Sequence, residues 1–496
     1  MANEYLYGAY GKLGNTVARN AVQSGTVVVY FGLAPINLVR KFAEKNLINN
    51  PIKLTNLPNA MQTVGYSDDW GSFSLCEAVS AHFSNSIGNI GPIYVVNVLD
   101  PGKHKKSDAT VVDVAFANGQ ATINSDTIIL DSLKLDGLVE GTDYSIDYNY
   151  TKKMVMINSI GEKLNGTVEA AYDEVDSTVI VDEDIIGGVT AEGVYSGIGA
   201  LQLLYTQENA VANILAAPGW SENPKVYNAL CNAASQINGH WNAFVYADMP
   251  ILDSSVTPEV EVDTIAKAKT WQKDKGYNNE CSKVFWPMAQ DTLGNTYHLS
   301  TLAAVETQRV DYSHNSVPME TCGNKMIPMA KQYFGEKSKN KGFDQIQSKE
   351  LTSNGISTCV FWGGNWNLWG DHTAAYKYGA DVDARCIFDV SMRMLYYITN
   401  SFQREWGVVI DEPFTMQLRD RIINREQEKL DALVAQGALI GEPEVMFIES
   451  NNSVTDMMNG DFRWDIPVTP TPPLKSATVY VAYTDSGFSS YFEDTE

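Results

Sequence analysis

The stretch Gly25-Thr26-Val27-Val28-Val29-Tyr30-Phe31-Gly32 decides the fold. Its β-branched and aromatic residues, bounded by glycines, are typical of a buried strand. Residues 73–83 carry apolar positions at helical spacing, and Pro92-Ile93-Tyr94-Val95-Val96-Asn97-Val98 is a second buried strand. This order of strand, helix and strand predicts that a globular α/β domain begins at Gly25.

The same alternation of helix and strand returns over residues 198–290. Two of its predicted strands lead into Ala217-Pro218-Gly219 and Asp248-Met249-Pro250. These turns are typical of the carboxyl ends of a parallel sheet, where ligands often bind. The alternative is that the layer is a plain scaffold.

After Lys103-His104-Lys105-Lys106, apolar and polar residues alternate instead of recurring at helical spacing. Short strand candidates then follow one another across seventy residues. Strands this short and this closely spaced predict a small β-sandwich or barrel inserted into the α/β domain. The predicted strands are 110–116, 127–130, 144–148, 154–157 and 167–172.

Two helices are predicted in the last third of the chain. Asp381 and Asp383 are expected to open the first, over 381–404, because its apolar residues keep a spacing of three or four. Thr415 is a plausible N-cap for the second helix, over 415–436, which stops at Gly437. Its Arg419, Arg421 and Arg425 are a candidate contact for an acidic partner, the alternative being a solvated helix face.

Proline-rich sequence over 468–473 predicts an extended spacer before a strand at 477–483. A strand beyond a stiff spacer is placed to pair away from its own domain. With Glu4-Tyr5-Leu6-Tyr7, it predicts one strand at each end of the chain that joins neighbouring copies by strand addition. The residues expected in the C-terminal strand are Thr478, Val479, Tyr480, Val481, Ala482 and Tyr483.

Composition and sequence signals argue against several classes of protein. The 496 residues carry a formal charge of −24, which repels phosphate backbones and argues against direct nucleic-acid binding. The six cysteines form no zinc or disulfide pattern, so free thiols are expected. The first residues lack the features of a secretory signal, and no window of ~18 apolar residues predicts a membrane span. We therefore expect no membrane insertion and no Sec export.

Sequence motifs for catalysis are missing, and we predict no catalytic, metal or cofactor site. One aromatic cluster is a candidate binding site, because its tryptophans could stack on a sugar. The cluster is Phe361-Trp362-Gly363-Gly364-Asn365-Trp366-Asn367-Leu368-Trp369-Gly370. The alternative function is thus an α/β enzyme or carbohydrate-binding protein that uses this cluster, with Asp381 and Asp383 as a carboxylate pair. A surface-array or adhesin subunit is disfavoured by the missing export signal.

The chain resembles the sheath proteins of contractile phage tails and R-type bacteriocins. The resemblance runs from Gly25–Gly32 and Ala34-Pro35, through Ala216-Ala217-Pro218-Gly219, to Leu433–Gly441. Its most specific stretch is Trp369-Gly370-Asp371-His372-Thr373, which is similar to the family motif W-G-x-R-T. His372 stands where arginine is usual.

The resemblance implies a structural subunit, not an enzyme. Such subunits form six-fold rings stacked helically around a tail tube, are stitched together by their terminal arms, and contract to drive the tube through an envelope. Implied partners are further copies, the tube protein, and the baseplate and tail terminator proteins. The implied location is the virion tail, or a bacteriocin particle, assembled in the bacterial cytoplasm. Arg419, Arg421 and Arg425 become a possible tube-facing contact.

We therefore expect an α+β and α/β multidomain chain. Its C-terminal α+β assembly domain exchanges terminal strands, its middle domain is α/β, and its inserted domain is a small β-sandwich or barrel. The expected segments are an N-terminal arm (1–20), the α/β domain in two parts (21–102 and 178–345), the inserted β domain (103–177), the assembly domain (346–476) and a C-terminal arm (477–496).

Overall fold

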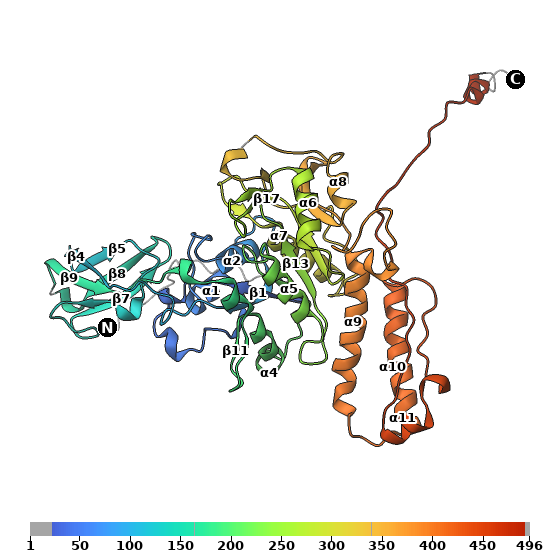
Figure 1. The fold of residues 1–496 in the computed structure, drawn as a ribbon, viewed down its shortest axis with the longest axis horizontal. Coiled ribbons are helices and arrows are strands. Elements are labelled where there is room, and N and C mark those ends of the chain that lie inside the picture. Colours follow the sequence, from blue (N-terminus) through green and yellow to red (C-terminus); the bar gives the residue numbers. More distant parts are fainter. Residues whose placement is uncertain (1–21, 163, 339, 492–496) are drawn as a thin grey trace, which may run out of the picture.

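A computed structural model describes residues 22–491 of the chain, apart from 163 and 339 (Figure 1). Its centre is an eight-stranded sheet in the order β2-β3-β1-β12-β13-β16-β20-β21. All neighbours pair in parallel except β2 with β3 and β20 with β21. The strands are β1 (Val22–Gly32), β2 (Pro51–Leu54), β3 (Ile90–Asn97), β12 (Ile214–Ala216), β13 (Phe244–Asp248), β16 (Ser282–Phe285), β20 (Ile356–Trp362) and β21 (Asn365–Trp369).

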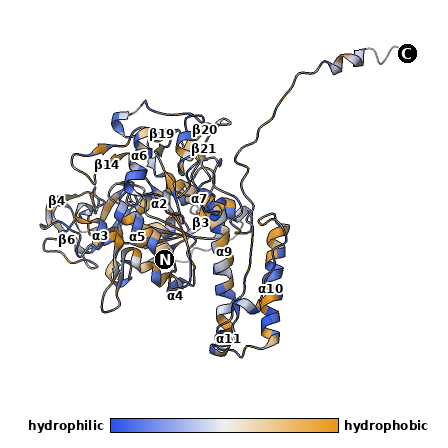
Figure 2. Ribbon diagram, turned by 45° about the vertical axis from the view of Figure 1, so that its right-hand side comes forward, coloured by the Kyte–Doolittle hydropathy of each residue, from blue (hydrophilic) through white to orange (hydrophobic). Residues whose placement is uncertain are grey.

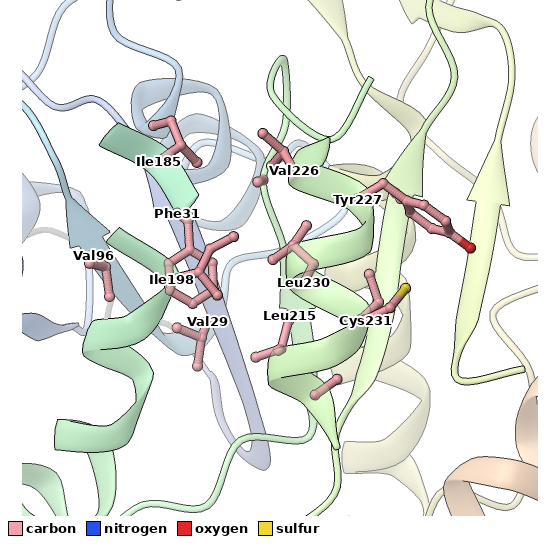
Figure 3. Close-up of a cluster of buried hydrophobic side chains, with 14 of the residues drawn as sticks. Val29, Phe31, Val96, Ile185, Ile198, Leu215, Val226, Tyr227, Leu230 and Cys231 are labelled. Atoms are coloured by element: carbon pink, nitrogen blue, oxygen red, sulfur yellow. The ribbon is translucent and has the colours of Figure 1, made fainter. Parts of the chain in front are cut away.

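Alternate residues of β1 enter two different cores, which explains its unbroken apolar sequence. Val29 and Phe31 enter a core that also holds Ile198 of the 3-10 segment Gly197–Leu203 and Leu230 of α5 (Pro224–Ala234), as Figure 3 shows. Val28 and Tyr30 pack on the opposite side with α2 (Leu75–Phe83) and α7 (Leu299–Ser313). Helices thus cover both faces of the sheet, as the sequence predicts for an α/β domain.

The β-strand candidates between 110 and 172 form two antiparallel three-stranded sheets, β4-β9-β6 and β5-β8-β7, on the left of Figure 1. Their apolar side chains, among them Phe116, Tyr144 and Ile157, share a separate core. The predicted strand 127–130 is reduced to one antiparallel bridge, between Ile128 and Glu174. The carbonyl of Ile128 also accepts a hydrogen bond from the side-chain amide of Asn37. The strands are β4 (Thr110–Phe116), β5 (Gln120–Ile123), β6 (Lys134–Leu135), β7 (Tyr144–Asn149), β8 (Met154–Ser159) and β9 (Gly166–Tyr172).

The two helices of the last third form a hairpin beside the sheet, α9 (Asp389–Trp406) and α10 (Met416–Ala435), with α11 (Val454–Asn459) near its far end (Figures 1 and 2). The predicted start at Asp381 is wrong, because Asp383 instead caps a short 3-10 turn, Ala384–Cys386. Thr415 is confirmed as the N-cap of α10, since its hydroxyl accepts the amide of Leu418 at 3.2 Å.

The other elements are short. The helices are α1 (Leu57–Thr63), α3 (Asp182–Ile186), α4 (Leu204–Glu208), α6 (Ile265–Lys275) and α8 (Lys349–Thr352). The strands are β10 (Gly188–Val189), β11 (Tyr195–Ser196), β14 (Leu252–Asp253), β15 (Val260–Glu261), β17 (Met288–Gln290), β18 (Thr296–Tyr297) and β19 (Lys331–Tyr333). No helix in the described part of the chain is both long and apolar enough to span a membrane.

The chain is thus a mixed α/β protein of several domains. One strand pairing crosses a boundary between two of the expected domains. β20 and β21 fall in the predicted assembly domain, yet β20 pairs in parallel with β16 of the α/β sheet. The other segment boundaries stay predictions. The predicted N-terminal arm, with Glu4, Tyr5, Leu6 and Tyr7, lies outside the described residues.

Candidate assembly site

The inner face of α9 carries three buried polar residues, Asp389, Arg393 and Asn400. Their spacing of four and seven places them on one side of the helix, where each has a partner in the α/β domain. Asp389 pairs with Lys283 of β16, at 2.6 Å from carboxylate to ammonium, and both side chains are fully buried. Although burial opposes its charge, Asp389 raises the pKa of Lys283, so the pair is ionic.

Further donors and acceptors complete this pair. The Lys283 ammonium also donates to the carbonyl of Gly370 at 2.9 Å, and the Thr321 hydroxyl donates to Asp389 at 3.0 Å. A buried ion pair is stable only when such additional hydrogen bonds are made. The start of α9 is thereby fixed to the sheet.

Arg393 makes the second contact, one helical turn further along α9. Its guanidinium pairs with Asp311 of α7, and both side chains are almost fully buried. The same carboxylate accepts the hydroxyl of Thr26 in β1 at 2.7 Å. Three elements that are distant in sequence therefore converge on Asp311.

Asn400 makes the third contact through two hydrogen bonds. Its amide nitrogen donates to the carbonyl of Asn242 at 2.7 Å, and its oxygen accepts the backbone amide of the same residue at 3.0 Å. None of these three contacts was predicted from the sequence. Polar residues recurring at helical spacing within the apolar stripe of 387–402 were the available signal.

The outer face of α9 borders an apolar groove of about 360 Å³. Leu395, Ile398 and Phe402 line it from α9, and the extended segment 464–468 forms the opposite wall with Trp464, Ile466 and Val468.

One edge of the segment 464–471 is paired. Asp465 exchanges backbone hydrogen bonds with Met446 at 2.9 Å each way, and Thr469 and Thr471 continue the pairing with residues 438–440. No backbone hydrogen bond within the described residues involves Trp464, Ile466 or Val468. The segment therefore presents a strand edge with open backbone groups beside an apolar groove.

The described part of the C-terminal arm leaves the body as an extended chain (Figure 1). Four of its large side chains are between 81% and 93% exposed. Residues 478–483 pair with no strand among those described. These four are Val479, Tyr480, Val481 and Tyr483.

The three arginines of α10 do not share one face of the helix. Residues 419 and 421 point about 160° apart on a helix that turns about 100° per residue, whereas 421 and 425 are neighbours on the helix surface. Arg425 pairs with Glu405 of α9 at 3.0 Å, and Arg419 with Asp420 at 2.7 Å. Arg421 lies 3.8 Å from Glu412. All three are partly exposed, and each already has a carboxylate beside it.

His372 is a buried residue of the scaffold. Its Nδ1 is 2.8 Å from the carbonyl of Ile387, and its ring stacks on Tyr376 at 3.5 Å between centroids. Burial lowers its pKa, so the imidazole is neutral near pH 7. A neutral ring cannot replace the charge of the arginine that the family motif places there.

The aromatic cluster is the β20–β21 hairpin, turned by Gly363 and Gly364 at positive φ. Trp369 and Trp366 are partly covered, while Phe361 and Trp362 at the hairpin end are more than half exposed. Of the predicted carboxylate pair, Asp383 has its side chain engaged as the cap of a turn and in an ion pair with Arg385. Among the described residues, no three His, Cys, Asp or Glu lie close enough together to hold a metal ion.

The carboxyl ends of the parallel strands hold a closed ionic cluster. The His298 ring lies between two carboxylates, with Nδ1 2.7 Å from Glu77 and Nε2 3.4 Å from Glu222. Burial alone would lower the pKa of His298, but these carboxylates raise it well above its ordinary value. Burial also raises the pKa of nearby Asp248 to about 6. The expected ligand position is filled by the chain's own side chains.

We predict that Lys283→Met destabilises the protein by about 3–5 kcal/mol, because the Asp389 carboxylate stays buried without its cation. Lys283→Met with Asp389→Leu should recover most of this loss. Urea unfolding measures both. Lys225→Met, which breaks an exposed pair with Glu183, is the matched control. Equal stability of the Lys283→Met variant and the control would contradict the role of the buried pair.

We also predict a pH-dependent effect of His298→Gln. Because the folded pKa is raised, the stabilisation by His298 is complete below about pH 6.5 and is lost as the pH rises through the folded pKa. The difference in unfolding free energy between the wild type and His298→Gln should therefore shrink from pH 6 towards alkaline pH. His240→Gln, at an exposed position, is the control. A difference that grows with pH would contradict the assignment.

Comparison with known proteins supports one family. No family model matches the chain. The chain is 27% identical over 515 aligned residues to the tail sheath protein of Burkholderia phage BcepMu, covering 96% of each. It is 22% identical to the major tail sheath protein of Serratia phage KSP20, covering 75% of this chain and 94% of the other.

Solved structures share the overall fold. The helical sheath of the anti-feeding prophage in its contracted state matches with a TM-score of 0.54 at 13% identity, covering 98% of this chain and 100% of that chain. A chain of the anti-feeding prophage baseplate gives a TM-score of 0.56 at 13% identity, covering 97% and 99%. In sequence and in fold, this chain is related to the contractile tail sheath proteins.

Proposed function

We propose that this chain is a structural subunit of a contractile tail sheath. It polymerises as stacked hexameric rings around a tail tube and contracts to drive the tube through the target envelope. The observation that carries the proposal is the sequence match to a phage tail sheath protein over 96% of both chains. The groove, the open strand edge and the exposed arm support it, because they are features of a protein that is completed by neighbouring copies.

The arm and the groove are chemically matched. The arm offers alternating apolar side chains, Val479 and Val481, that no described residue covers. The groove offers apolar walls, and beside it the segment 464–468 has unpaired backbone groups. In the proposed assembly, Thr478–Tyr483 of one copy adds as a strand to segment 464–468 of another. Strand addition joins copies through main-chain hydrogen bonds, with the pockets giving specificity.

The remaining parts of the chain have roles in the same proposal. The inserted β domain projects outward as decoration, and the α9–α10 hairpin belongs to the inner, assembly-forming region. The tail tube, the baseplate and the tail terminator are the proposed partners. The particle is a virion tail or a bacteriocin, assembled in the bacterial cytoplasm.

Electron microscopy of the purified protein tests the function. We expect hollow, striated cylinders with six-fold symmetry. Monomers at every concentration and salt condition would contradict a sheath.

Deletion of residues 478–496 should leave a folded monomer that cannot polymerise, because the described residues of this arm add little to the core of their own chain. Deletion of residues 1–18 should have the same effect if both arms donate strands. Circular dichroism reports folding, and sedimentation velocity reports assembly. Normal cylinders from either truncated chain would refute strand exchange through that arm.

Charge reversal of Arg419, Arg421 and Arg425 to Glu should abolish assembly on the tube if these residues face it, since rim charges set partner choice. Co-sedimentation with the tube protein measures this. Reversal of the exposed Lys103, Lys134 and Lys152 in the inserted domain is the matched control. Unchanged assembly of the arginine variant on the tube would exclude a tube-facing role.

A further inference from the structure

The far end of the helical hairpin carries an exposed apolar surface. We define the hairpin tip as residues 405–417 and 447–462. The two segments are joined by stacking of Phe414 on Phe462, with ring centroids 3.7 Å apart. Five large apolar side chains of the tip are between 69% and 83% exposed, namely Val408, Ile410, Met416, Val454 and Met458. Exposed apolar side chains gathered in this way mark an interaction site.

The hairpin tip is also strongly acidic. Its two segments contain six carboxylates and no lysine or arginine, and two of the six, Glu405 and Glu412, have an arginine of α10 beside them. Glu412 and Asp461 are among the six. A partner for the tip therefore needs apolar side chains surrounded by positive charge.

A surface with these properties lies on the same chain. We define the basic end as α6 with residues 346–352 and 376–379, which together hold six lysines and two carboxylates. Ile346 is 67% exposed there and Tyr378 is 77% exposed. Tyr378 is joined to the end of α8 by the hydrogen bond from its amide to the carbonyl of Ser353 at 2.8 Å.

Half of these lysines are available for a partner. Lys267, Lys269 and Lys275 pair with carboxylates of their own chain. Among the described residues, no carboxylate lies within ion-pair distance of the other three. These three lysines, all exposed, are Lys273, Lys349 and Lys377.

The two surfaces lie at opposite ends of the molecule. In Figures 1 and 2, α6 is at the top of the view and α11 is at the bottom. The C-terminal arm leaves from beside the basic end, because the ammonium of Lys475 lies 5.0 Å from the centre of the Tyr376 ring. If the hairpin of a second copy docks on the basic end of a first copy, the groove of the second copy lies close to the point where the C-terminal arm of the first copy leaves its body.

We propose that the hairpin tip of one copy docks on the basic end of the next copy. This inference rests on the proposed function and names a contact within the polymer that is separate from the exchanged strands. Because the two surfaces are different and lie at opposite ends, the contact is head-to-tail and does not close by itself. It generates a filament in which each donated arm starts beside its recipient groove.

A charge swap tests the contact in the full-length protein. Glu412→Lys with Asp461→Lys reverses the charge at two positions of the tip, and Lys273→Glu with Lys349→Glu reverses it at two positions of the basic end. Each pair alone should raise the concentration needed for polymerisation about tenfold, because ionic attraction between the two surfaces is weakened and like charges face each other at the changed positions. All four changes together should restore polymerisation. Sedimentation velocity and electron microscopy provide the readouts, and thermal unfolding checks that each variant folds.

The control reverses two exposed carboxylates of the inserted domain, Asp147→Lys with Glu169→Lys, and should polymerise like the wild type. Wild-type polymerisation by both charge-reversed pairs would overturn the contact and leave the proposed function standing. Failure of the fourfold variant to recover, although folded, would also overturn it. If the tip variant polymerises normally but no longer binds the tube protein, the tip docks on the tube instead. Failure of the wild type itself to polymerise would refute the proposed function.

Discussion

Burial of the Lys283–Asp389 ion pair is the constraint on which the arrangement of the chain depends. Two opposite charges without water require each other, and the Gly370 carbonyl and the Thr321 hydroxyl complete their hydrogen bonds. Together with Arg393–Asp311, the pair fixes the first turns of α9 to the parallel sheet. One face of α9 is thus committed to the sheet, and its other face is left to line the apolar groove. A force on a strand bound in that groove would reach the α/β domain through buried polar contacts, which resist sliding more than apolar packing does because breaking them leaves an unpaired charge.

Structural features that depend on residues close together in the sequence could be predicted, whereas contacts between residues far apart in the sequence could not. The run Gly25–Gly32 predicts a buried strand because its residues enter cores on both sides of the sheet, and the Thr415 cap is purely local. The expected helix start at Asp381 was wrong because an acidic residue caps a 3-10 turn as readily as a helix. The buried partners of α9 could not be predicted, since Lys283 and Asp389 are 106 residues apart and either residue alone is typical of a surface. The edge at 464–468 lies among turns and has no periodicity of its own.

The charge of −24 gains a more specific meaning from its distribution. Copies of a chain with this net charge repel one another at long range, so contacts between them must be local and complementary. The acidic hairpin tip, the lysines of α6 and α8, and the apolar arm are such local features. Salt would weaken the repulsion and the ionic contacts together, whereas the proposed donated strands would be held by main-chain hydrogen bonds and apolar burial, which salt affects little. In the proposed assembly, the donated strands are therefore the contacts best suited to survive a change in subunit packing.

The central claim is that copies of this chain are joined by a strand donated from the C-terminal arm. A helical reconstruction of the assembled protein, at a resolution that separates strands, tests it most directly. The account predicts an additional strand, Thr478–Tyr483 of a neighbouring copy, hydrogen-bonded along segment 464–468 with its apolar side chains in the groove of α9. An assembly in which this edge faces solvent, or in which the arm folds back on its own subunit, would contradict it.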